Sequence, residues 1–187
     1  ADNGMFFNGE FRVSSADDHY DSAAFEIWFK MSQLQGAGQV LFETGSTNRG
    51  LSMTLGNASA GDADGNDDDL HVRVAGGGSE AFITIDLSQY ADPSRDFMQV
   101  IVVANDRKSR KDEVNLYLNG ARFGQVRLRK TADLDWDGSC CAGLGFARGI
   151  VGAIGGSEPP PFSLTDFDGH IAMFRFYKQS LTDDQVL

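Results

Sequence analysis

Short stretches in which hydrophobic and polar residues alternate recur along the whole chain. The clearest is residues 25–31, FEIWFKM, in which Phe25, Ile27 and Phe29 are each separated by one residue. A period of two is typical of a β-strand that buries one face. Residues 98–104, MQVIVVA, are instead apolar almost throughout. That pattern indicates a central strand covered on both faces.

The same pattern, with turns rich in Gly and Asp, predicts an all-β chain. We expect strands at residues 6–13, 25–31, 39–43, 50–55, 70–74, 81–87, 98–104, 114–118, 121–129 and 167–177. The Asn119-Gly120 pair is a strong signal for a tight hairpin between two of them. We predict a single antiparallel β-sandwich over residues 1–187, a module cut from a larger protein, because both ends of the sequence look trimmed.

The amino-acid composition supports this fold and argues against nucleic acid and the membrane interior as binding partners. The 187 residues are 41% hydrophobic, enough for one sizeable core. The net charge is −11, and only six of the 27 acidic residues are Glu. Most of the negative charge therefore comes from Asp, which is more common in turns than in helix interiors. Such an acidic chain is a poor candidate for binding nucleic acid. It has no apolar run of 18 residues, so we expect no insertion into a membrane.

Four segments, in chain order, resemble the motifs of laminin G-like, concanavalin A-type jelly-roll modules, which occur in many extracellular proteins, notably in bacteria. They are FEIWFK at 25–30, QVLFETG and GLSM at 39–53, VNLYLNG at 114–120, and FDGHIAMFRFY with SLTDDQV at 167–186. WDG at 136–138 with AGLG at 142–145 is similar to a bacterial branch of these modules. The resemblance implies a jelly roll and a secreted or cell-surface location. It leaves function open, because this fold hosts lectins, adhesion modules, peptide binders and glycosidases.

Two acidic segments are candidate calcium loops, because alternate carboxylates around a Gly turn can wrap this cation. In the first, Asp133, Asp135 and Asp137 precede Gly138, but Leu144 stands where such a loop needs its final bidentate Glu. The second offers the oxygen-bearing side chains of Asp62, Asp64, Asn66, Asp67, Asp68 and Asp69. The alternative for both is a solvated acidic turn.

A third calcium site follows from the resemblance alone. Some modules of this kind hold a structural calcium between the N-terminal and last strands, and Asn8, Asp166 and Asp168 are its candidate ligands here. Ca²⁺ is therefore the candidate cofactor.

Two features are candidates for ligand binding. Trp136 lies among turn residues, where its ring could stack on a sugar or could instead pack over the edge of the sandwich. Arg127 and Arg129 alternate with apolar residues and so point to one face of a strand, near the basic residues Lys108, Arg110 and Lys111. This basic stripe could bind sulfate or carboxylate groups of an anionic polysaccharide, or could be a solvated sheet face.

Catalytic patterns are weak. The six Glu residues are scattered singly, and the Glu-x-Asp-x-x-Glu run of laminarinase-type enzymes is missing from the sequence. Cys140 and Cys141 are adjacent and lack a recognisable triad. We expect a non-catalytic module that recognises carbohydrate or another cell-surface ligand, alongside other domains of its parent protein. The alternatives are a spacer or protein-binding adhesion module, and a glycosidase whose site is unrecognised.

Overall fold

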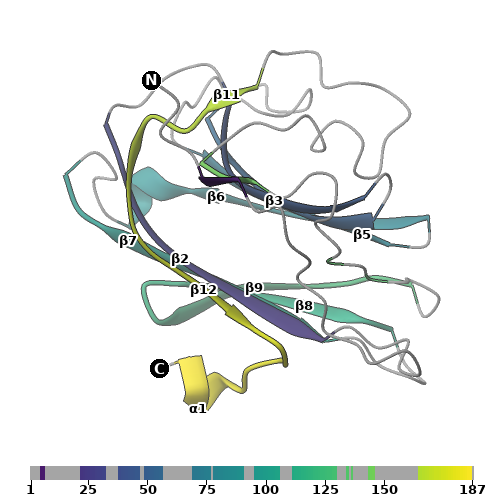
Figure 1. Ribbon diagram of the computed structural model, residues 1–187. Coiled ribbons are helices and arrows are strands. Elements are labelled where there is room, and N and C mark those ends of the chain that lie inside the picture. The colour runs from purple at the N-terminus through teal and green to yellow at the C-terminus, as the bar shows by residue number, and fades with distance from the viewer. Residues whose placement is uncertain are drawn as a thin grey trace.

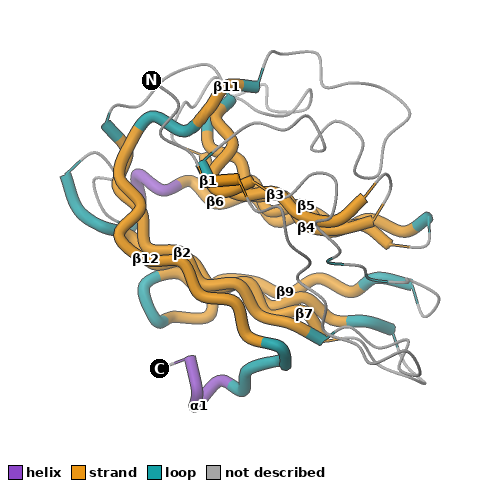
Figure 2. Tube along the Cα trace, in the orientation of Figure 1, coloured by secondary structure: helices purple, strands orange, loops and turns teal. Residues whose placement is uncertain are grey.

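The computed structural model of the protein consists of two β-sheets stacked face to face (Figure 1). The structure describes residues 5–6, 22–32, 38–46, 49–56, 69–76, 78–90, 95–105, 111–129, 134, 136, 143–145 and 164–186. Most of these lie in strands, and the tube in Figure 2 shows both layers. The predicted all-β antiparallel sandwich is confirmed.

The first layer is a seven-stranded sheet. Its order is β1 (Met5–Phe6), β10 (Gly143–Leu144), β3 (Gln39–Ser46), β4 (Arg49–Leu55), β5 (Asp69–Gly76) and β6 (Ser79–Asp86), and β11 (Thr165–Asp166) pairs in parallel with β3. The second layer is a five-stranded sheet in the order β12 (Gly169–Tyr177), β2 (Ala23–Met31), β7 (Met98–Asn105), β8 (Glu113–Leu118) and β9 (Ala121–Arg127). A 3-10 turn, η1 (Leu87–Gln89), follows β6, and a short helix, α1 (Asp183–Val186), follows β12.

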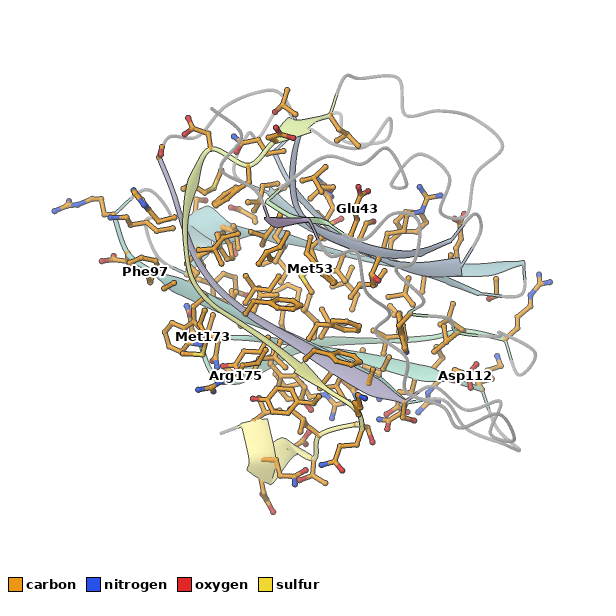
Figure 3. All side chains as sticks on the ribbon, in the orientation of Figure 1. Glu43, Met53, Phe97, Asp112, Met173 and Arg175 are labelled. Atoms are coloured by element: carbon orange, nitrogen blue, oxygen red, sulfur yellow. The ribbon has the colours of Figure 1, made fainter. Side chains whose placement is uncertain are left out.

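The core lies between the sheets, where the alternating hydrophobic residues of the strands meet. Phe25, Ile27 and Phe29 of β2 are fully buried there, and Figure 3 shows Met53 of β4 in the same layer. The strand β7 is covered on both faces, as its apolar sequence predicts. One face joins the core, while Ile101 on the other belongs to a second hydrophobic cluster with α1.

Two tight backbone features depend on residue type. Asn119 and Gly120 both adopt positive φ, of 50° and 78°, which is the geometry of the type I′ turn that joins β8 to β9. The predicted hairpin is therefore confirmed. At Gly169 a Cβ atom would lie 2.3 Å from the backbone oxygen of Lys30, so the close pairing of β12 with β2 requires glycine here.

Several boundaries differ from the sequence-based expectation. β6 ends at Asp86, because its carboxylate accepts a hydrogen bond from the Ser88 backbone N–H (3.0 Å) and caps the turn η1. The strands β10 and β11 have two residues each, too short to give an alternating pattern. The expected strand at 6–13 lies outside the described residues, apart from Phe6 in β1.

Candidate functional site

Trp136 is a core residue. Its side chain is 1% exposed, and its ring packs edge-on against Phe25 with centroids 5.4 Å apart. The hydroxyl of Thr44 on β3 donates to the Trp136 backbone oxygen at 3.1 Å and fixes the segment against the sheet. This ring offers no face to a sugar, so the sugar-stacking alternative is corrected in favour of packing.

Arg127 and Arg129 lie at the surface on and just after β9, with buried Leu128 between them. The Arg127 side chain is 62% exposed, and its Nε lies 3.6 Å from Glu113 Oε2 on β8. The backbone N–H of Arg129 donates to Ser79 Oγ on β6 at 3.1 Å. The last contact joins the two sheets, so both arginines stand where the edge of one sheet meets the edge of the other. Lys111 is also exposed, whereas Lys108 and Arg110 lie outside the described residues.

Of the acidic residues predicted to bind calcium, only three are described. Asp69 is buried at the start of β5, and Asp166 and Asp168 are exposed at β11 and beside it. Within the described ranges, no three His, Cys, Asp or Glu side chains are grouped to hold a metal ion. The remaining candidates lie outside those ranges: Asn8, Asp62, Asp64, Asn66, Asp67, Asp68, Asp133, Asp135 and Asp137. The calcium prediction therefore stays a prediction.

Exposed aromatic side chains also lie along β6 and β9, and the Tyr90–Phe123 pair is at the end of β6 opposite Ser79 and Arg129. Of the four large hydrophobic side chains that are at least 36% exposed in the described part of the chain, three belong to β6, to the turn after it or to β9: Phe82, Tyr90 and Phe123. The rings of Tyr90 and Phe123 meet edge to face with centroids 5.7 Å apart. Since large exposed aromatic groups mark ligand surfaces, we treat this region as the candidate site. The β6–β9 edge is defined by Phe82, Tyr90, Phe123, Arg127 and Arg129.

β6 and β9 lie at the open ends of their sheets, each with one hydrogen-bonded neighbour among the described strands. The Ile83 side chain of β6 fills the space between them, since a Cβ atom placed on Gly124 of β9 would lie 3.5 Å from its Cγ2. An edge strand presents backbone N–H and C=O groups that no strand partner uses. The edge therefore offers backbone hydrogen-bonding groups beside aromatic rings and guanidinium groups.

Phe82 is held in a fixed position on the outer face of the seven-stranded sheet. The guanidinium of Arg73, its partner across β5 and β6, lies 4.9 Å from the ring centroid. Arg73 also forms a 2.7 Å ion pair with Glu80. The ring is 51% exposed despite these contacts. One arginine is thus committed to positioning an aromatic ring, while Arg127 makes only a long contact and keeps donors for a ligand.

The outer face of the five-stranded sheet carries a buried carboxylate, Glu26, that binds four donors. Its Oε1 accepts from Trp28 Nε1 (2.9 Å) and Gln99 Nε2 (2.8 Å). Its Oε2 accepts from the Tyr177 hydroxyl (2.7 Å) and Arg175 (3.3 Å). Burial alone would raise the pKa of Glu26, but the bonds from Gln99, Trp28 and Tyr177 and the charge of Arg175 together lower it below 4.5. Glu26 is therefore an ionised structural link between three strands.

Sequence reasoning missed both of these arrangements. The partners of Glu26 on β12 lie about 150 residues away along the chain, and the Tyr90–Phe123 pair joins two different sheets. The alternation that places Glu26, Trp28 and Lys30 on one strand face was a usable signal. No local signal identifies their partners.

Two described carboxyl groups have a lowered pKa, the opposite of what a glycosidase acid needs. Glu26 is lowered as above, and hydrogen bonds from Ser88 and Gln89 lower the pKa of Asp86. Glu80 is occupied by Arg73. The environments of Glu26 and Asp86 therefore favour the ionised form of each carboxyl group.

Comparison with known proteins agrees with this fold. The family model described as the concanavalin A-like lectin/glucanases superfamily matches residues 7–187. No curated protein matches the chain. Within the described residues, no helix has the length and apolar character needed to cross a membrane.

Solved structures show the same architecture at low sequence identity. The Ruminococcus gnavus sialidase CBM40, solved with α2,3-sialyllactose, is 14% identical with a TM-score of 0.56, over 89% of this chain and 81% of that one. The receptor-binding domain of the botulinum neurotoxin C/D mosaic is 14% identical with a TM-score of 0.57, over 90% of this chain and 35% of that one. The binding domain of botulinum neurotoxin DC, in complex with SialylT, is 14% identical with a TM-score of 0.54, over 89% and 34%.

Proposed function

We propose that this chain, which belongs to the concanavalin A-like lectin/glucanases superfamily, is a non-catalytic carbohydrate-recognition module. The β6–β9 edge is its binding surface. Tyr90 and Phe123 stack on the C–H faces of sugar rings, and Arg127 and Arg129 bind acidic groups of the glycan.

One observation carries this proposal: exposed aromatic rings and exposed guanidinium groups occupy a single edge. The Tyr90 and Phe123 side chains are 50% and 36% exposed although they contact each other. A ligand that covers these two rings would remove apolar surface from water, which is favourable. A few polar groups beside an apolar surface is also the usual composition of a small-ligand site.

The solved relatives are compatible with an acidic glycan. The sialidase module was solved with a sialylated trisaccharide, and a toxin binding domain with SialylT. At 14% identity these proteins share the fold with this chain, and fold alone does not transfer a ligand. The support for this chain therefore rests on its own arginines and aromatic rings.

Calcium dependence and location complete the proposal. The Asp-rich segments would supply Ca²⁺ ligands, and a secreted or surface-anchored parent protein would present the module to glycans outside the cell. Glycan binding that persists in chelator would support the carbohydrate function and contradict its dependence on calcium.

A glycan array probed in calcium and in chelator tests the function. We expect retention of a defined set of glycans, enriched in acidic ones, and loss of that retention in the Tyr90→Ala/Phe123→Ala variant. Phe97→Ala is the matched control, because Phe97 is also exposed (44%) but lies beside Lys30 of β2. Equal, weak signals across all glycans would contradict the proposal and favour a spacer or protein-binding module.

A further inference from the structure

The outer face of the five-stranded sheet is divided into two halves. The chain's own C-terminal segment covers one half, where Leu181 and Val186 pack on a small hydrophobic cluster that contains Ile101, Val103 and Tyr117. Figure 1 shows α1 beneath this sheet, on the side away from the core. Asp183 accepts a hydrogen bond from the Tyr117 hydroxyl and fixes the segment in place. The face is therefore able to hold a polypeptide segment.

The second half, on β12, β2 and the start of β7, lacks such a cover among the described residues. Cross-strand pairs place Met173 beside Trp28 and His170 beside Lys30 on this face. Figure 3 shows Met173 and Arg175 projecting from the sheet on the side opposite Met53, with Phe97 at one end. We call this surface the β12–β2 face, defined by Trp28, Lys30, Phe97, His170, Met173 and Arg175.

Four side chains of the β12–β2 face are held by contacts within the protein. Glu26 holds the indole of Trp28 through its N–H and one side of the Arg175 guanidinium. The ammonium of Lys30 lies 5.5 Å from the ring centroid of Phe97. Side chains that are already fixed lose little conformational entropy when a partner binds.

The charge of this face is opposite to that of the whole chain. Its exposed or half-exposed charged and titratable side chains on the strands are basic: Lys30, His170 and Arg175. The carboxylate between them, Glu26, is 4% exposed and occupied by its four donors. At the rim, Arg95 and Asp96 are exposed and opposite in charge. A chain of net charge −11 thus presents a basic strip that also carries an indole, a thioether and a phenyl ring.

We propose that the β12–β2 face docks an acidic polypeptide segment of a partner protein. The segment's apolar side chains lie on Trp28, Met173 and Phe97, and its carboxylates pair with Lys30 and Arg175. The basic side chains of this face attract an acidic segment, whereas the rest of this acidic chain repels it. The C-terminal segment covers the adjoining half in the same manner, with apolar side chains against the sheet. This surface is separate from the β6–β9 edge and does not depend on carbohydrate binding.

Trp28 provides the test, since the chain has two tryptophans and the other, Trp136, is 1% exposed. Acrylamide quenching of tryptophan fluorescence is measured with a synthetic peptide of alternating Glu and Leu, with the corresponding Lys and Leu peptide, and with a neutral maltooligosaccharide. We expect only the acidic peptide to protect the fluorescence, and high salt to weaken that protection. The Trp28→Phe variant should lose the quenchable signal.

Two charge reversals of equal size locate the contact. Lys30→Glu should weaken binding of the acidic peptide about tenfold, which is the effect of losing one charge-assisted contact. Arg129→Glu, just after the distant β9, should leave the affinity for this peptide unchanged. Equal weakening by both variants, protection by the basic peptide, or unchanged quenching with every probe would overturn the proposal. Protection by the neutral oligosaccharide alone would also overturn it, by showing a sugar surface instead.

Discussion

Replacing Glu26 with Gln removes a buried charge while keeping the shape of the side chain. In the native protein each carboxylate oxygen accepts two bonds, Oε1 from Trp28 and Gln99 and Oε2 from Tyr177 and Arg175. An amide has one acceptor oxygen, so its nitrogen must face two of these four donors. The tyrosine hydroxyl can rotate to accept, but Arg175 cannot.

The size of the loss follows from these contacts. Hydrogen bonds to a charged group contribute about 1.5–3 kcal/mol each, and neutral bonds about 0.5–1.5 kcal/mol. Weakening three bonds and losing the one from Arg175 should lower the free energy of unfolding by about 2–3 kcal/mol. For a chain of this length, this corresponds to a fall in melting temperature of roughly 4–12 °C. Differential scanning calorimetry at neutral pH measures it.

Acid should remove the difference between the two proteins. The pKa of Glu26 is lowered in the folded state below its ordinary value of 4.5. The stabilisation from its charge is therefore fully present above pH 4.5 and is lost as the pH falls through the folded pKa. The melting temperatures of wild type and Glu26→Gln should converge as the solution becomes more acidic than this.

Glu80→Gln is the matched control. Glu80 pairs with Arg73 at 2.7 Å, but its side chain is 37% exposed. A surface pair contributes about 0–1 kcal/mol, so this change should lower the melting temperature only slightly. Equal effects of the two substitutions, or a Glu26→Gln deficit that persists unchanged into acid, would refute the reasoning about a buried, ionised link.

Three further changes have defined outcomes. Trp136→Ala should lower the free energy of unfolding by about 3–5 kcal/mol in denaturant titrations, because it empties a fully buried site beside Phe25. Burial and the hydrogen bond to Asp183 raise the pKa of Tyr117 to about 12. The stability that the protonated Tyr117 hydroxyl contributes to the folded state is therefore lost as the pH rises from about 10 to 12. Asp183→Asn should lower the pH at which Tyr117 ionises, as measured by ultraviolet titration. If the Asp-rich segments bind calcium, chelation should lower the melting temperature by several degrees. An unchanged melting temperature would contradict calcium binding.

The strands with long alternating runs were predictable because a buried face imposes a period of two. β2, β7 and the β8–β9 hairpin lie where hydrophobic pattern and turn residues placed them. The two-residue strands β10 and β11 contain too few residues for any pattern, and pairing with β3 defines them. Local sequence therefore predicted the layers but not how the short segments extend the larger sheet.

The candidate site was only partly predictable. Alternation placed Arg127 and Arg129 at the surface, and for Trp136 the sequence favoured packing over stacking on a sugar without excluding either. Only packing against Phe25 decides between these for Trp136. The Tyr90–Phe123 contact forms because the fold brings the turn after β6 next to β9 of the other sheet, and one sequence gives no register between sheets.

Carbohydrate recognition at the β6–β9 edge is tested most directly by mapping amide chemical shifts while an oligosaccharide retained on the array is added to the labelled protein. We predict saturable shifts in residues 79–90 and 121–129, with the largest changes around Tyr90 and Phe123, and none in the Tyr90→Ala/Phe123→Ala variant. Shifts confined to other strands, or retained in full by that variant, would contradict carbohydrate binding at this edge.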